Sequence, residues 1–353
     1  GEYTGWTNFG FYFIVEMIGS VLDLYSIELD GVDLISFYSL PENSSVAAVF
    51  SQVESSNPKI LGEGTSAFYY GEYPDGAWLG TLTEIKSTDG YWLIIDEDDD
   101  ATLDVAGIPS DSSIVYNLHE HTNLISYPFA GSAPIDETIP DSTQYAIDAI
   151  LGEGSAAMNT GTGWVGALVN LSGTEGYWFI TNAEVSFAFE PPEEGAARME
   201  SLIRAVPLEY AFKQSTQQAF FFIENATIGG EPLEMEDMII AYNGDVIVGS
   251  RYWYGDVTDV PAMGTDGSDA YAGYCILGDK INFKVLDASS GNLIEMVADG
   301  ETSWNNFGIS VINLSEQMII PDEISFSSAY PNPFNPVTML SFSVPAEMDI
   351  EII

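Results

Sequence analysis

Positive charge is scarce in this sequence of 353 residues. Lys and Arg number 8 against 54 Asp and Glu, which gives a formal net charge of −46. Such a chain repels both the phosphate backbone of nucleic acids and anionic lipid headgroups, so we expect neither nucleic acid nor a membrane as a partner. A shell of carboxylates suits a salty or calcium-rich medium, although it also serves solubility alone.

Cysteine and long apolar runs are also rare. Cys275 is the single cysteine, so the sequence offers no disulfide within the chain, and its apolar neighbours predict a buried thiol. The most apolar stretch, residues 11–24, is interrupted by Glu16, Gly19 and Asp23. No window reaches the roughly 18 apolar residues of a membrane-spanning helix. No basic segment precedes this stretch, so we expect any export signal to have been removed.

Signatures of catalysis are missing as well. The two histidines, His119 and His121, are spaced to share one face of a strand, where they could bind a metal, but a surface position is the simpler expectation. No nucleophile elbow, Cys–His pair, phosphate-binding loop or zinc-protease helix is found. We therefore predict that the chain is not an enzyme. Carboxylate pairs for glycoside hydrolysis stay open, because an acidic chain offers many of them.

What the sequence has in quantity is apolar side chains arranged in a duplication. Hydrophobic residues make up 46% and aromatic residues 13% of the chain, too much apolar surface for a disordered coil. Four blocks recur in order: residues 34–38 at 124–128, 60–64 at 150–154, 78–80 at 164–166, and 90–92 at 176–178. The offset falls from 90 to 86, which indicates a four-residue deletion in the second copy. The sequence therefore predicts two tandem repeats.

Each copy reads as short antiparallel strands. Runs of β-branched and aromatic residues alternate with Gly, Pro, Ser and Asp, and residues 91–95 and 177–180 are the clearest strands. Apolar residues three and four apart suggest one short helix per repeat, over 45–53 and 142–150. The repeated Trp residues and Gly-Tyr-Trp blocks predict core and turn positions, with a binding cage as the alternative.

The predicted fold class is therefore all-β, with two related sandwich-like repeats, an Ig-like sandwich and minor helix. The expected boundaries are 1–24 for an N-terminal strand segment, 25–110 for the first repeat, 111–192 for the second, 193–217 for a linker, 218–320 for the sandwich of about seven strands, and 321–353 for a C-terminal segment.

Calcium is the best-motivated ligand, because Asp- and Gly-rich loops supply the oxygen atoms that hard cations take. Two clusters qualify. The first consists of Asp256, Asp259, Asp266 and Asp269, and the second of Asp96, Asp98 and Asp100. Neither matches an EF-hand loop, and turn formation is the alternative for both.

A resemblance to a known family is carried by a motif near the C-terminus. The motif consists of Tyr330, Pro331, Asn332, Pro333, Phe334, Asn335 and Pro336, and an alternating strand pattern follows it. This resembles the opening of the C-terminal sorting domain of bacterial type IX secretion cargo, and residues 321–353 are then the start of such a domain. Most of that domain is absent from the chain. The resemblance implies an extracellular or outer-surface location and recognition by the type IX secretion machinery.

Two functions follow as expectations. The first is a secreted or cell-surface structural or adhesive protein, which assembles with copies of itself or with surface components. The apolar run at residues 9–15 and the truncated sorting strands would then form a filament by strand exchange. The second is a carbohydrate-binding region of a secreted hydrolase, in which exposed rings of Trp78, Trp164 and Trp253 stack on polysaccharide.

Overall fold

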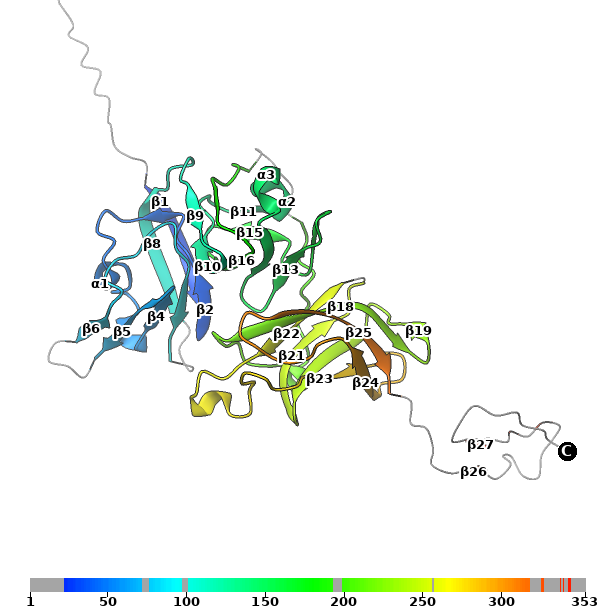
Figure 1. The fold of residues 1–353 in the computed structure, drawn as a ribbon. Helices are drawn as coiled ribbons and strands as arrows, with labels where there is room; N and C mark the ends of the chain where they lie inside the picture. The colour runs from blue at the N-terminus through cyan, green and yellow to red at the C-terminus, as the bar shows by residue number, and fades with distance from the viewer. Residues whose placement is uncertain are drawn as a thin grey trace, which may run out of the picture. The chain divides into compact units, whose positions relative to one another are not determined.

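The structure is a computed structural model that describes residues 22–71, 76–96, 101–192, 199–255 and 257–317, together with 325–326, 337, 339 and 342–343 (Figure 1). Its strands form several sheets with a few short helices, which confirms the all-β prediction. The chain divides into two compact units, Gly1–Ser201 and Leu202–Ile353, and both predicted repeats belong to the first. In the described part, no helix is long and apolar enough to cross a membrane.

The first repeat is built from eight strands and short helical turns. These are β1 (Asp23–Leu29), β2 (Val32–Ile35), β3 (Ser39–Leu40), α1 (Val46–Val49), a 3-10 turn (Glu54–Ser56), β4 (Lys59–Gly62), β5 (Thr65–Tyr70), β6 (Ala77–Gly80), β7 (Tyr91–Ile94) and β8 (Ala101–Pro109). Five of the strands form a sheet in the order β2-β7-β4-β5-β6, and β8 pairs with β1 and β3.

The second repeat reproduces this plan. Its elements are β9 (Tyr116–Leu118), β10 (His121–Ser126), β11 (Ser132–Pro134), α2 (Ile135–Thr138), α3 (Asp141–Gln144), β12 (Ile147–Leu151), β13 (Ala156–Asn159), β14 (Trp164–Val165), β15 (Asn170–Ser172), β16 (Gly176–Thr181) and β17 (Val185–Phe187). Its five-stranded sheet runs β10-β16-β12-β13-β14. Trp92 and Trp178 therefore lie on the second strand of their respective sheets, as the duplication predicts.

The helix prediction was correct only in part. In the first repeat α1 covers Val46–Val49, inside the predicted range. In the second repeat the prediction of a helix over 142–150 is wrong, because the chain leaves α3 at Gln144 and forms strand β12 from Ile147. Ile147, Ala149 and Ile150 are buried at strand pairing positions between β13 and β16, so sheet contacts override the helix-like spacing.

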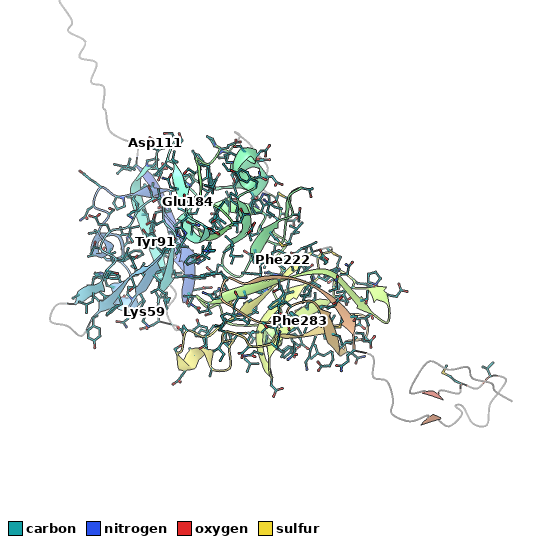
Figure 2. The ribbon with its side chains drawn as sticks, in the orientation of Figure 1. Lys59, Tyr91, Asp111, Glu184, Phe222 and Phe283 are labelled. Atoms are coloured by element: carbon teal, nitrogen blue, oxygen red, sulfur yellow. The ribbon has the colours of Figure 1, made fainter. Side chains whose placement is uncertain are left out.

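Each repeat has an aromatic core on the inner face of its sheet. Tyr91 lies within the first repeat (Figure 2) and is buried in its core, and Tyr177 is buried in the second core, so both Gly-Tyr-Trp blocks supply core residues. In the second core, Phe189 packs edge-on against Tyr116, Tyr127 and Phe179. Edge-on ring pairs of this kind add to the free energy gained by burial.

The second unit contains one large curled sheet. Its elements are a 3-10 turn (Leu208–Tyr210), β18 (Gln218–Ile228), β19 (Glu231–Pro232), β20 (Met238–Asn243), β21 (Val246–Tyr252), β22 (Thr258–Met263), a 3-10 turn (Asp269–Tyr271), β23 (Asn282–Leu286), β24 (Leu293–Asp299), β25 (Ile309–Glu316), β26 (Ser325–Phe326) and β27 (Phe342–Ser343). The sheet runs β19-β18-β25-β24-β23-β20-β21, with β22 also paired to β18. Its core includes Phe221 and Phe283, whose rings meet edge-on at 5.3 Å.

A buried ion pair joins two strands of this sheet, β21 at one end of the order and β22 beside β18. The Arg251 guanidinium on β21 lies 3.4 Å from the Asp259 carboxylate on β22 and donates Nε–H to the Asp259 carbonyl oxygen. Tyr254 donates its hydroxyl to the same carboxylate at 2.7 Å.

Before β18, part of the segment predicted as a linker packs on the second unit, since Val206 and Tyr210 contact the cluster of Met238, Ile240 and Tyr242.

Candidate functional site

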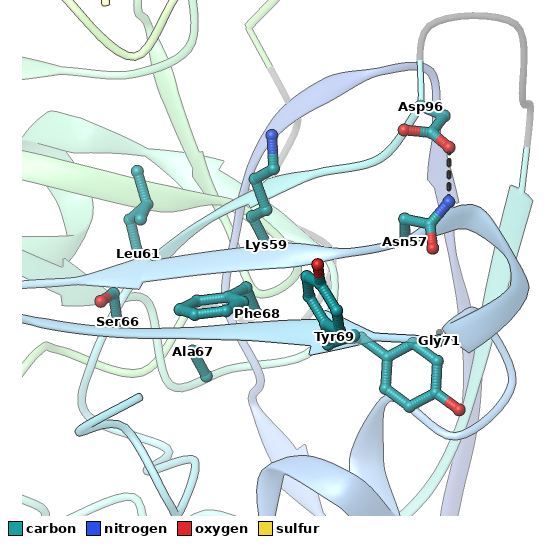
Figure 3. A pocket seen from close by; sticks show the side chains of 10 residues that line it. Asn57, Lys59, Leu61, Ser66, Ala67, Phe68, Tyr69, Gly71 and Asp96 are labelled. Carbon is teal, nitrogen blue, oxygen red and sulfur yellow. Dashed lines mark hydrogen bonds between the residues drawn. The ribbon is translucent and has the colours of Figure 1, made fainter. Parts of the chain in front are cut away.

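A groove lies on the outer face of the first repeat's sheet, over β4 and β5. It has a volume of about 590 Å³. Because side chains alternate along a strand, Ala67 enters the core while Phe68 and Tyr70 face outward, 41% and 48% exposed. Figure 3 shows Leu61, Lys59 and Phe68 on one side of the strands and Ala67 on the other.

Polar groups border the apolar floor of the groove. Lys59 stands directly across from Phe68 in the strand register and is exposed. Asn57 Nδ2 donates to Asp96 Oδ2 at 2.8 Å, which fixes both side chains at one end (Figure 3). Within the described residues, Lys59 forms no ion pair, whereas Lys86, Arg204, Arg251, Lys280 and Lys284 each have an acidic partner.

The second repeat lacks the aromatic residue of this groove. Lys59 on β4 corresponds to Ala149 on β12, and Phe68 corresponds to Met158, since each pair faces its partner at the same register position. A lysine opposite a phenylalanine is thus replaced by an alanine opposite a methionine. The groove chemistry belongs to the first repeat alone.

A second polar site lies where the two repeats meet. Here the Leu-Ile-Ser block of each repeat contacts the loop before the Gly-Tyr-Trp block of the other. Ser36 N–H donates to the Thr174 carbonyl at 3.0 Å, and Ser126 N–H donates to the Thr88 carbonyl at 3.1 Å. Isolated bridges join Ile35 with Glu175 and Asp89 with Ile125 in the same reciprocal manner. The two repeats therefore meet with pseudo-two-fold symmetry, and we call this contact the junction.

Glycine is required at the centre of the junction. A Cβ atom added to Gly90 would lie 2.9 Å from the Ile125 carbonyl oxygen, and one added to Gly176 would lie 2.8 Å from the Ile35 carbonyl oxygen. Either would also lie 3.2 Å from the other glycine's Cα. The glycine of each Gly-Tyr-Trp block is thus explained by the close approach of two backbones.

The tyrosine of each block supports the same loop. Tyr91 Oη accepts a hydrogen bond from Lys86 N–H at 2.9 Å, and Tyr177 Oη accepts one from Ser172 N–H at 2.7 Å. Burial raises the pKa of both phenols, so both hydroxyls stay protonated at physiological pH.

Two glutamates from the repeated Ile-Leu-Gly-Glu-Gly blocks complete the junction. Glu153 Oε2 accepts Leu34 N–H at 3.0 Å, and Glu63 Oε2 accepts Leu124 N–H at 3.0 Å. The surroundings of the two carboxylates differ. We name one the acidic corner, made of Asp30, Asp33 and Glu153, and the other the histidine corner, made of His119, Asn123 and Glu63.

In the acidic corner Asp33 is buried and accepts Asp30 N–H at 3.2 Å. Burial, reinforced by the charge of Asp30, raises the pKa of Asp33 from 3.8 to about 7. The pKa of Glu153 is also raised, by removal of its carboxylate from water and then by Asp33 and Asp30. The acidic corner therefore favours bound protons.

In the histidine corner His119 N–H donates to Asn123 Oδ1 at 2.9 Å, matching the Asp30–Asp33 contact. Nδ1 of His119 lies 2.8 Å from the Glu120 carbonyl oxygen and Nε2 lies 2.7 Å from Glu63 Oε1. Both partners are acceptors, so both contacts are satisfied only by the imidazolium form. These two contacts raise the pKa of His119, and the larger contribution comes from the hydrogen bond to the Glu120 carbonyl oxygen. His119 lies between β9 and β10, whereas His121 begins β10, so the two histidines do not share one face of a strand; both are exposed.

The predicted calcium ligands are dispersed. Asp259 is engaged by Arg251 and Tyr254, while Asp266 accepts Ser268 N–H within a turn. Asp269 begins a 3-10 turn, and Asp96 binds Asn57. The remaining candidates, Asp98, Asp100 and Asp256, lie outside the described residues. Across the described ranges, no group of three or more His, Cys, Asp or Glu is arranged to hold a metal, and calcium binding stays a prediction.

The tryptophans proposed as stacking platforms face inward. Trp253 is only 6% exposed, and Trp78 and Trp164 are half-buried against the two repeat cores. Trp78 packs 5.5 Å from the Tyr69 ring and donates its indole N–H to Glu54.

Sequence reasoning missed Phe68 and Tyr70, although their alternation with Ala67 in a strand was a usable signal. Cys275 is buried, as predicted.

The predicted terminal features are largely beyond the described part of the chain. The sorting motif at 330–336 and the apolar run at 9–15 both lie outside the described residues. Within the segment 321–353, Phe342 of β27 pairs with Phe326 of β26, so one of its strands has a partner in its own chain.

Comparison with known protein families, with curated proteins and with solved structures finds no match to this chain. The chemistry of the groove and of the junction is therefore the basis for function.

Proposed function

We propose that this chain is a secreted or cell-surface adhesive protein that acts by binding, with the groove of the first repeat as its contact surface. The observation that carries the proposal is the pair of half-exposed aromatic rings, Phe68 and Tyr70, on the open face of a sheet. Large rings of this kind provide contact area at low cost in side-chain entropy, and they dominate the energetics of binding surfaces.

The difference between the repeats supports a division of labour. The second repeat keeps the sheet order and the junction contacts but has Met158 in place of Phe68. A residue needed only for the fold would be expected in both copies. Aromatic residues confined to one copy fit a contact surface carried on a shared scaffold. The sorting motif, with the extracellular location that its resemblance implies, supports adhesion as the purpose of that surface.

The test is retention of the purified full chain on three surfaces, coated with gelatin, with insoluble cellulose, and with the chain itself. We expect retention on at least one, and at least a tenfold loss for the double variant Phe68→Ala/Tyr70→Ala. Tyr145→Ala is the matched control, because Tyr145 is a more exposed ring (74%) in the same unit but outside the groove. Retention on none of the surfaces, or equal retention of the double variant, contradicts the proposal.

A further inference from the structure

The groove combines apolar rings with one cation and one anion, and this combination restricts the ligand. Phe68 and Tyr70 are two residues apart on β5, so their side chains leave the same face about 7 Å apart. Their faces suit a ligand with flat apolar surfaces. The ligand must also satisfy Lys59, a donor, and Asp96, an acceptor, at the border of the same groove.

Charges at the groove disfavour two classes of ligand. An anionic chain is repelled by the net charge of −46 and by Asp96, which lines the groove. A cationic peptide is attracted by the net charge, but in the groove it would place like charge beside Lys59, which stands across from Phe68 and has no acidic partner within the described residues. An uncharged ligand meets neither penalty.

Polarity excludes a third class. A lipid or other wholly apolar ligand that filled the groove would remove Lys59 and the Asn57–Asp96 pair from water without replacing their hydrogen bonds. The cost of leaving such groups unpaired is on the order of 1–3 kcal/mol each, and more for a charge. The ligand must therefore carry groups that both donate and accept hydrogen bonds, as hydroxyl groups do.

Sugar rings meet all these conditions. A pyranose presents C–H groups on its faces, which pack on aromatic rings, and hydroxyl groups at its edge. We infer that the groove of the first repeat binds an uncharged polysaccharide chain, with its sugar faces on Phe68 and Tyr70 and its hydroxyls on Lys59 and Asp96. This inference rests on the proposed adhesive function and names the partner. The stacking surface then consists of Phe68 and Tyr70 rather than the tryptophans, which face inward.

The experiment is affinity electrophoresis of the full chain in gels containing soluble xyloglucan, mixed-linkage β-glucan or glucomannan, with alginate as the anionic polymer. We expect retardation by at least one neutral polymer and none by alginate. Phe68→Ala should weaken binding at least tenfold and Lys59→Met about threefold to tenfold, with melting temperatures unchanged. Met158→Ala, the matched position in the second repeat, and Tyr145→Ala should bind as the wild type does.

The outcomes separate this inference from the proposed function. Binding to alginate alone, or retention on gelatin or on the chain itself with no binding to any neutral polysaccharide, overturns the sugar assignment and leaves adhesion standing. Equal loss of polysaccharide binding in Phe68→Ala and Tyr145→Ala also overturns it, because the effect would not be specific to the groove. No retention on any surface and no retardation in any gel overturns both.

Discussion

The two corners of the junction use the same backbone contacts and opposite side-chain chemistry. In each, a glutamate from one repeat accepts the N–H of a leucine from the other at 3.0 Å. Around that contact the acidic corner gathers three carboxylates, whereas the histidine corner pairs one carboxylate with an imidazolium. The comparison teaches that the backbone contacts hold the repeats together, while the charges make the strength of the junction depend on pH.

The largest expected effect comes from forcing apart the centre of the junction, between the two corners. Gly90→Ala combined with Gly176→Ala places each new methyl group within 3 Å of a backbone carbonyl oxygen of the other repeat. Overpacking of this kind costs about 1–3 kcal/mol per site, so the first unit should lose about 2–6 kcal/mol of unfolding free energy. Denaturant unfolding measures it. Gly71→Ala is the control, since its Cβ would meet only ordinary contacts at 3.6 Å; equal stability of both variants would refute the role given to the glycines.

The next largest effect comes from a substitution that makes the two corners more alike. Asp33→Asn places in the acidic corner the side chain that Asn123 has in the other. The folded-state pKa of Asp33 lies above the unfolded value, so wild-type stability falls as pH rises from about 4 to about 7. The variant should not show this fall. Its unfolding free energy should exceed that of the wild type by up to a few kcal/mol at pH 8, since one pKa unit corresponds to about 1.4 kcal/mol, and should equal it at pH 4. Melting curves across this range decide; a gain that is equal at both pH values would be inconsistent with titration of Asp33.

A smaller change acts on the loops beside the junction. Tyr91→Phe and Tyr177→Phe each remove the hydroxyl that accepts a loop N–H, from Lys86 and Ser172 respectively. Loss of one such hydrogen bond costs about 0.5–1.5 kcal/mol. Tyr177 also donates its hydroxyl to Glu175 Oε2 at 2.9 Å, and Tyr91 makes no such bond within the described residues, so Tyr177→Phe should lose more unfolding free energy than Tyr91→Phe. Denaturant unfolding measures both losses; a larger loss for Tyr91→Phe would contradict this expectation.

The smallest effect concerns the exposed pair in the histidine corner. His119→Gln removes the imidazolium that contacts Glu63. A raised folded-state pKa means that the stabilisation is complete below the ordinary His value of 6.5 and is lost as pH rises through the folded value. The side chain is 58% exposed, so the loss should stay below about 1 kcal/mol at pH 5.5 and vanish by pH 9. Titration of the His119 ring by NMR gives the direct check; a pKa at or below 6.5 would be contrary to the geometry.

Much of the fold was readable from the sequence, because the repeated blocks occupy equivalent strands. Residues 90–92 and 176–178 lie at β7 and β16, and the Ile-Leu-Gly blocks form β4 and β12. The error over 142–150 arose because the spacing of Ala146, Ile147 and Ile150 fits a helix as well as a buried strand. Alignment with residues 56–60, which precede and begin β4, could have corrected it.

The junction was not predictable from the sequence in the same way. Gly90 and Gly176 were identified as turn residues, yet glycine is required there by contacts with chain segments 35, 86 and 141 residues away, which no local pattern encodes. The glutamates Glu63 and Glu153 were recognised as part of a repeated block, but their partners lie 61 and 119 residues away. Long-range partners of this kind require the fold.

The pseudo-two-fold junction has a consequence for how the two repeats can change over time. In a pair of identical subunits, every substitution at a symmetric contact occurs twice. A new charge therefore changes both symmetry-related sites in the same way. Within one polypeptide, each side is encoded separately, and a substitution occurs once. Asp33 and Asn123 can therefore differ while both retain their hydrogen bond to the backbone. Covalent linkage of the repeats therefore lets one copy carry Phe68 and Tyr70 while the other carries Met158 at the position of Phe68.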